Sequence, residues 1–157
     1  MNKKLLAVAG VTLAVIVLVA PLTVDAAAGK HDFAVGGFQG NGDNNVGFSA
    51  QSDADGANPF GHLSQTIPNV RKDRFRVTCL AVSGSEAALG LTPANAQTAQ
   101  NFPNGRVLAV RDNGNPTNGQ PVDEYGYYAA SAADCANFVS GAVFLPVNGN
   151  ILVHDVP

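Results

Sequence analysis

The chain has 157 residues, with nine Lys and Arg against twelve Asp and Glu, which gives a net charge of −3. This length suits one domain with a hydrophobic core of its own. The mildly acidic balance, without a basic stripe, argues against nucleic acid or an anionic membrane as a partner. The two cysteines match no metal-ligand spacing, so they predict no metal cofactor.

The N-terminus has the order of a secretory signal peptide. A short positive segment precedes an apolar run of 18 residues, and small residues then occupy the −3 and −1 positions of a cut after Ala26 or Ala28. We expect residues 1–26 to be removed, residues 27–157 to form one domain, and the protein to be secreted and extracellular. Because the cut removes two lysines and one aspartate, the remaining net charge is −4. A retained anchoring helix is the alternative, since 18 apolar residues are near the lower limit for spanning a bilayer.

Short runs with a period of two residues follow one another from Gly29 onward. Five Asn-Gly pairs favour tight hairpin turns, because both residues tolerate positive φ. No window keeps the apolar period of a helix of normal length. The runs predict strands at residues 32–39, 46–51, 59–66, 74–83, 85–91, 106–112, 122–129 and 150–155. About eight short strands predict an all-β, antiparallel, mostly up-and-down barrel; a two-sheet β-sandwich is the alternative.

The clearest strand candidate surrounds Cys79. Phe75, Val77 and Cys79 fall on one face of a period-two strand, and Arg74 and Arg76 fall on the other. We expect the first face to point into the core. The two arginines are expected in solvent, paired with acidic residues of a neighbouring strand.

The two cysteines, Cys79 and Cys135, are expected to form a disulfide. An exported chain enters an oxidising compartment, and no third cysteine competes. The bond would tie the central strand candidate to an apolar segment near the C-terminus. Two buried free thiols are the alternative, because cysteine is often buried.

Two segments interrupt the strand pattern. Residues 92–103 are uncharged and nearly without large apolar side chains, which is typical of a long surface loop. Residues 131–148 are too apolar for a loop and are expected to fold back onto an end of the barrel or to add a strand. Short helical turns are expected only at 94–100 and 131–138.

The second half contains three motifs: Arg-x-x-Cys-Leu-x-Val-x-Gly at residues 76–84, Val-x-Asp-Asn-Gly-x-Pro at 110–116 and Gly-Asn-Ile-x-Val-His at 149–154. Together they resemble those of a family of small secreted proteins from actinobacteria and related bacteria. The last is similar to the ending of the domain called post-COAP. Asn115 departs from the acidic residue usual in the second motif. The family has no known activity, so the resemblance implies an exported β fold and no catalytic residue.

An oxygen-rich patch is the densest group of candidate metal ligands. Ca²⁺ prefers carboxylate and carbonyl oxygens, but the spacing is not that of a Ca²⁺-binding loop. The favoured interpretation is that these side chains bond their own backbone to set a turn, with no cofactor, and Ca²⁺ is the alternative. The patch consists of Asp112, Asn113, Asn115, Asp123 and Glu124.

Aromatic and histidine side chains supply the candidate ligand-binding residues. Tyr125 and Tyr127 share a face of one predicted strand, and Phe60 and His62 lie in another. Aromatic side chains at a barrel mouth can bind a small molecule, although they more often pack in the core. His62 and His154 have no third partner at a fixed spacing, so they predict neither a metal site nor a catalytic set.

The sequence therefore predicts a secreted, non-enzymatic β-barrel that acts as an extracellular or cell-surface interaction or structural module. One alternative is a small-ligand carrier that uses the barrel interior. The other is a barrel enzyme, an isomerase or a hydrolase, that uses His62 or His154. A core filled by Phe and Val would favour the module, and a cavity above ~300 Å³ with inward polar groups would favour the carrier.

Overall fold

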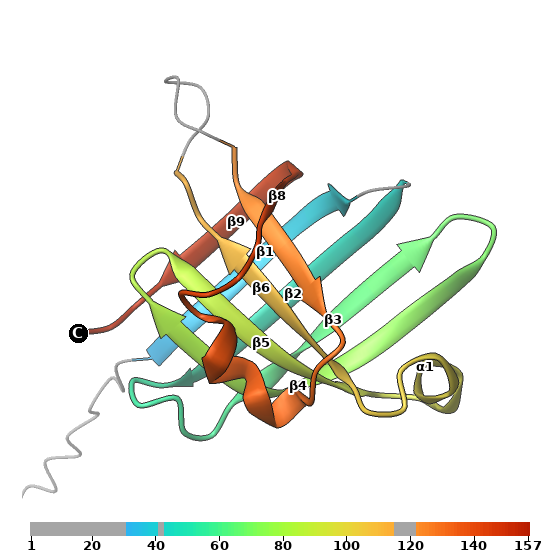
Figure 1. Cartoon of the computed structure of the whole chain (residues 1–157), viewed down its shortest axis with the longest axis horizontal. Coiled ribbons are helices and arrows are strands. Elements are labelled where there is room, and N and C mark those ends of the chain that lie inside the picture. The colour runs from blue at the N-terminus through green and yellow to red at the C-terminus, as the bar shows by residue number, and fades with distance from the viewer. Residues whose placement is uncertain (1–30, 41–42, 115–121) are drawn as a thin grey trace, which may run out of the picture.

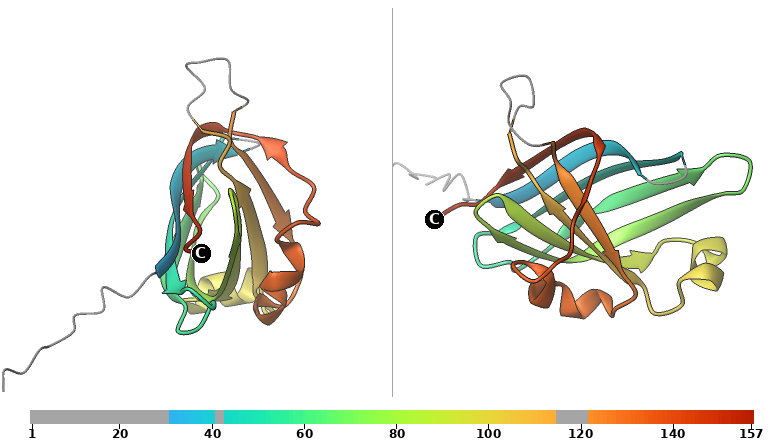
Figure 2. Two further views of the ribbon diagram at one scale, coloured as in Figure 1. Left: turned by 90° about the vertical axis from the view of Figure 1, so that its left-hand side faces the viewer. Right: turned by 45° about the horizontal axis from the view of Figure 1, so that its top comes forward.

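The computed structural model describes residues 31–40, 43–114 and 122–157, and the expected signal peptide lies outside these ranges. Within them nine antiparallel strands form one sheet that curls into a nearly closed barrel (Figure 1 and Figure 2). The strands are β1 (His31–Gly40), β2 (Asn44–Asp53), β3 (Phe60–Ile67), β4 (Arg71–Ser83), β5 (Glu86–Pro93), β6 (Arg106–Arg111), β7 (Glu124–Tyr128), β8 (Leu145–Pro146) and β9 (Asn148–His154).

The order of the strands in the sheet is β8-β7-β6-β5-β4-β3-β2-β1-β9. Strands β1 to β7 thus form an up-and-down meander, and the last strand returns to the first, where Gly36 lies opposite Ile151. The predicted all-β antiparallel barrel is confirmed. All nine strands of the described residues belong to one sheet, so the alternative of two packed sheets is wrong.

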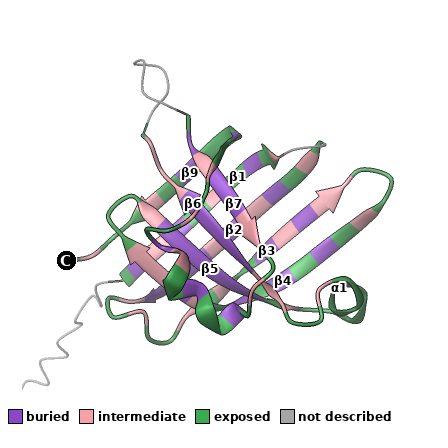
Figure 3. Ribbon diagram, viewed as in Figure 1, coloured by how far each residue is buried: buried purple, intermediate pink, exposed green. Residues whose placement is uncertain are grey.

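Alternate residues of each strand build the core inside the barrel. Val46, Phe48 and Ala50 of β2 are buried, as are Phe75 and Val77 of β4, while the residues between them are more exposed. Figure 3 shows this alternation as bands along the strands. Burial of these apolar side chains is the main contribution to stability, at roughly 25 cal/mol per Å².

A β-bulge in β4 changes the side of the wall that Cys79 faces. The register with β5 shifts between Val77 and Cys79, and Leu80 rather than Cys79 joins the core inside the barrel. The expectation that Cys79 continues the inward face of Phe75 is therefore wrong. A bulge inserts one extra residue into a strand and so reverses the alternation beyond it.

The 3-10 helix η2 (Ala132–Phe138) covers the outer face of the barrel wall (Figure 2). Its Cys135 is bonded to Cys79, with the two Cα atoms 6.1 Å apart, which confirms the predicted disulfide. Around the bond lies a second cluster of buried apolar residues that includes Ala88, Val107 and Val139. Strands β5 and β6 therefore carry long buried runs, covered on both faces (Figure 3).

The close approach of η2 depends on Gly90 in β5. A Cβ atom at this position would overlap the carbonyl oxygen of Ala132. Residues 131–148 thus pack against the side of the barrel. The expectation that this segment folds back onto an end of the barrel is therefore wrong. The same segment also supplies the two-residue strand β8, in agreement with the other expectation.

The expected surface loop before β6 contains the short helix α1 (Ala96–Asn101). Its Thr98 is fully buried, and the hydroxyl of Thr98 accepts a hydrogen bond from Arg74 N at 2.9 Å. This contact holds the segment across one end of the barrel, where Phe102 packs on Phe75 with ring centroids 5.4 Å apart. Within the described residues, no helix is long and apolar enough to cross a membrane.

Candidate ligand-binding site

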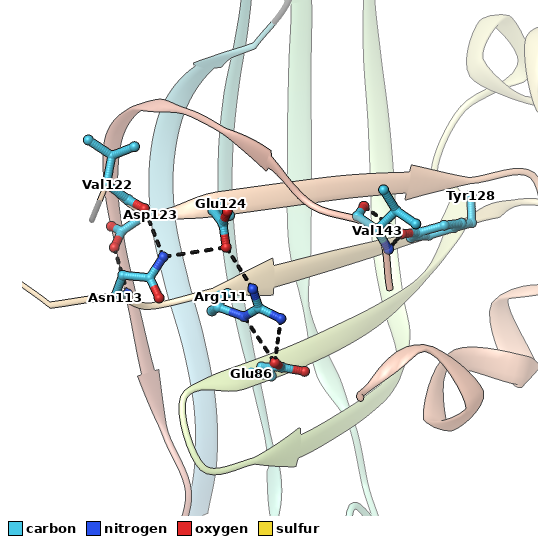
Figure 4. Close-up of polar contacts among 8 residues, drawn as sticks. All are labelled: Glu86, Arg111, Asn113, Val122, Asp123, Glu124, Tyr128 and Val143. Atoms are coloured by element: carbon cyan, nitrogen blue, oxygen red, sulfur yellow. Dashed lines mark hydrogen bonds and ion pairs between the residues drawn. The ribbon is translucent and has the colours of Figure 1, made fainter. Parts of the chain in front are cut away.

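The oxygen-rich patch closes the barrel. Strand β9 pairs with β1 on one side, and carboxylates accept its backbone N–H groups on the other. Buried Asp123 accepts from Ile151 N at 2.6 Å and from Asn113 N at 2.9 Å. Asp112 accepts from Val153 N at 3.1 Å. These side chains take the place of a neighbouring strand beside β9. We call this junction between β9 and the residues Asp112 and Asp123 the seam, part of which Figure 4 shows.

Ion pairs hold the next part of the patch. Arg111 lies between Glu86 and Glu124, with nitrogens 2.8 Å from each carboxylate (Figure 4). Burial acts to lower the pKa of Arg111, but hydrogen bonds to Glu86 and Glu124 outweigh it and raise this pKa above its ordinary value. The amide of Asn113 donates to Val122 O at 2.8 Å. The described residues of the patch thus have protein partners.

No group of three or more His, Cys, Asp or Glu side chains in the described part of the chain is arranged to hold a metal ion. Asp112 also accepts from Gly114 N at 2.8 Å, the local contact expected of a turn. Asn115 lies outside the described residues. The contacts favour a structural role for the patch over a calcium site.

Two of the four predicted ligand residues lie outside the barrel. Phe60 is 57% exposed, and His62 is also exposed, so the expectation that they line the interior is wrong. Leu63 and Gln65 take the inward positions of β3, and the period of two then turns Phe60 and His62 outward. His154 is exposed as well.

Arg74 and Arg76 lie on the exposed face of β4, as expected. Their neighbours on β3 are Ser64 and His62, and neither arginine forms an ion pair with a described residue. The expected acidic partners are therefore not on the neighbouring strand.

The other two predicted residues, Tyr125 and Tyr127, point into the barrel from β7. The ring of Tyr125 contacts those of Phe38 and Tyr127, with centroids 4.7 Å and 5.7 Å apart. Tyr127 lies nearer the end of the barrel at which β3 ends and β4 and β6 begin, which we call the α1 mouth. Burial raises the pKa of Tyr127 above its usual range.

A group of inward polar side chains replaces the apolar core at the α1 mouth. Gln65 and Asp73 lie opposite each other on β3 and β4, and Asp73 is completely buried. Arg71 Nε donates to Asp73 Oδ2 at 2.8 Å. Arg106 enters from the start of β6, two residues before the buried Leu108. We call the whole set the mouth cluster: Asn44, Gln65, Arg71, Asp73, Arg106 and Tyr127.

The mouth cluster contains most of the unpaired buried polar atoms. Six buried side-chain nitrogen or oxygen atoms have no hydrogen-bond partner in the described residues, and all but Ser52 Oγ belong to this cluster. The five are Asn44 Oδ1, Gln65 Oε1, Asp73 Oδ1, Arg106 Nε and Tyr127 OH. Native proteins pair nearly all such atoms with protein groups, water or ligands, so this cluster is the place in the described interior that most calls for further partners.

Arg106 is the central cation of the cluster. Its guanidinium lies 3.6 Å from the ring centroid of Tyr127 and 4.9 Å from that of Phe102. No carboxylate of the described residues is within ion-pair distance of it. Burial lowers the pKa of Arg106, which nearby Tyr127 and Asp73 partly offset. Arginine nevertheless keeps its charge at neutral pH.

A pocket of about 530 Å³ opens beside Arg106. Two stretches line it, residues 101–106 from the end of α1 to the start of β6 and residues 129–131 after β7. Phe102, Pro103 and two alanines provide apolar surface, and Arg106 provides charge. The volume lies within the range of small-molecule sites, and such sites combine apolar walls with a few polar groups.

Sequence reasoning missed Gln65, Asp73 and Arg106. The signal was present, because a period of two places Asp73 on the face of Phe75 and Arg106 on the face of Leu108. A charged residue in phase with core residues at a strand end indicates an inward polar group. No family model, curated protein or solved structure matches this chain, so the geometry alone supports the assignment.

Proposed function

We propose that this protein is an exported β-barrel that binds a small organic molecule in the pocket beside Arg106. One observation carries the proposal: Arg106, whose Nε is buried without a partner in the described residues, lines a pocket of about 530 Å³. The pocket exceeds the ~300 Å³ at which ligand sites begin, and it combines the apolar surface of Phe102 and Pro103 with the charge of Arg106.

The energetics support a binding site over a merely structural polar core. Each buried polar atom without a partner costs roughly 1–3 kcal/mol. Five of the six such atoms in the described residues belong to the mouth cluster, so most of this cost falls at one end of the barrel. Local departures of this kind occur at functional sites, where a ligand supplies the missing contacts.

Binding without chemistry is the activity that the cluster supports. His62 and His154 are exposed, and the described members of the mouth cluster include no His, Cys or Ser that would act as base or nucleophile. The signal-peptide pattern and the disulfide support export, because a disulfide forms readily in an oxidising compartment.

Blocking the pocket tests the proposal. Ala129 is exposed and lines the pocket, so Ala129→Trp fills the space with little disturbance of the core. Val70→Trp is the matched control, since Val70 is 68% exposed and lies outside the pocket lining. The wild type and both variants would be screened by thermal shift against small organic acids, alcohols and sugars. Native mass spectrometry would check each stabilising compound.

We expect at least one compound to raise the melting temperature of the wild type and of Val70→Trp, and to have no effect on Ala129→Trp. The proposal fails if no compound stabilises the wild type. It also fails if the compounds that stabilise the wild type stabilise Ala129→Trp as well.

A further inference from the structure

The charges of the mouth cluster do not balance. Asp73 is bound to Arg71, which leaves Arg106 as a second cation without a counter-charge among the described residues. Among the described residues of the cluster, only these three side chains are charged, and their net charge is +1. Asp73 favours the charge on Arg106 and Arg71 opposes it, so the two neighbours act on Arg106 in opposite directions.

The position of Arg106 suits recognition of a planar anion. The rings of Tyr127 and Phe102 lie within cation–π distance of the guanidinium. Hydrogen-bond donors of a guanidinium lie along its edge, where they match the two oxygens of a carboxylate. Arg106 Nε has no hydrogen-bond partner in the described residues, and Arg106 itself lines the pocket.

The lining of the pocket describes the rest of the ligand. The apolar surface of Phe102 and Pro103 suits a hydrocarbon body. Because the cluster has one excess positive charge and contains Asp73, it favours a monoanion over a dianion such as a phosphate ester.

We infer that the pocket takes a small monocarboxylic acid, whose carboxylate pairs with Arg106 and whose hydrocarbon body lies against Phe102 and Pro103. This inference rests on the proposed function and names its ligand class. It assigns to Arg106 the role of the anion-binding residue of the site.

Acids compared with their own amides provide the test, since the two differ in charge and little in shape. The probes are 3-hydroxybutyrate, mandelate and 4-hydroxyphenylacetate, each with its primary amide and titrated by calorimetry. Inorganic phosphate serves as the dianion probe. The proteins are the wild type, Arg106→Gln, Arg106→Lys and the control Arg74→Gln, which removes an exposed arginine of the outer face. Circular dichroism would verify that each variant is folded.

We expect the wild type and Arg74→Gln to bind at least one acid about tenfold more tightly than its amide. Arg106→Gln should abolish that difference, and Arg106→Lys should restore part of it. As a readout that needs no variant, the ¹⁵N–¹H resonance of Arg106 Nε should shift when the acid is added to the wild type and stay unchanged with the amide.

The outcomes separate the two proposals. If acid and amide bind the wild type equally, or only neutral compounds bind, the pocket is a ligand site and the carboxylate inference is wrong. If phosphate binds more tightly than the acids, the monoanion inference is wrong. If no compound of any class binds, both the proposed function and the carboxylate inference are wrong.

Discussion

At the scale of single residues, Tyr127 is the most informative side chain of the barrel interior. Its hydroxyl is buried and has no partner in the described residues, and Arg106 lies against its ring. A buried hydroxyl without a partner lowers stability, so this hydroxyl does not serve the folding of the barrel.

The raised pKa of Tyr127 predicts a fall in stability at alkaline pH. Below pH ~10 the hydroxyl is protonated in both the folded and the unfolded states, so its ionisation does not lower the free energy of unfolding there. Above this value the unfolded state loses the proton and the folded state keeps it, so the free energy of unfolding falls by about 1.4 kcal/mol per pH unit until the folded pKa is reached.

We therefore predict that Tyr127→Phe weakens the fall of the melting temperature between pH 9 and pH 11, and that at pH 7 it raises the free energy of unfolding by about 1–3 kcal/mol, because it removes a buried hydroxyl without a partner. Tyr128→Phe is the control, because its hydroxyl contacts Val143 outside the core and Tyr127 remains. An alkaline profile of Tyr127→Phe identical to that of the wild type would contradict the raised pKa.

Asp123 acts at the same scale as the acceptor that closes the seam. Asp123→Asn retains the size of the side chain but turns an amide N–H toward one of the two backbone donors of Ile151 and Asn113. We predict a loss of about 2–4 kcal/mol in the free energy of unfolding, measured in urea. Glu124→Gln, at a half-exposed ion pair, should cost less than about 1 kcal/mol. Equal effects of the two substitutions would contradict the seam role of Asp123.

Calcium distinguishes the two interpretations of the oxygen-rich patch. Because Asp112, Asp123 and Glu124 already have protein partners, we predict that neither Ca²⁺ nor EDTA changes the melting temperature of the wild type. A rise of several degrees with Ca²⁺ that EDTA reverses would establish a calcium site instead.

At the scale of elements, the contact between η2 and the barrel wall depends on a missing side chain. In Gly90→Ala the new methyl group meets Ala132 O and the Cβ of Cys79, so η2 must move outward. We predict a loss of about 1–3 kcal/mol, the usual range for overpacking.

Gly47→Ala provides the matched control for this contact. A Cβ on Gly47 meets nothing within 4 Å, so that substitution should be neutral or stabilise slightly. Comparable losses for both variants in thermal unfolding would show that η2 does not depend on the close approach at Gly90.

At the scale of the whole molecule, the sequence predicts export. We predict that the mature chain begins at Ala27 or Gly29 and is found outside the cytoplasm, because the N-terminus has the order of a cleaved signal peptide. N-terminal sequencing of protein from the producing cells checks this, and a cytosolic chain that begins at Met1 would refute it.

Most of the fold could be predicted from the sequence, because the period of a strand is a local property. The alternation around Phe48 and Phe75, together with the turn residues between runs, was enough to predict the strands and the antiparallel barrel. The disulfide followed from there being only two cysteines in a chain with export features. These inferences need only neighbouring residues or a count.

Only the tertiary structure decided where the polar groups meet. The bulge before Cys79 and the outward direction of Phe60 depend on register, and one residue of slip exchanges the two faces of a strand. The seam at Asp123 and the mouth cluster around Arg106 join segments far apart in the chain. Their contacts arise from the curl of the sheet and from the path of the segment after α1, neither of which is encoded in a local pattern.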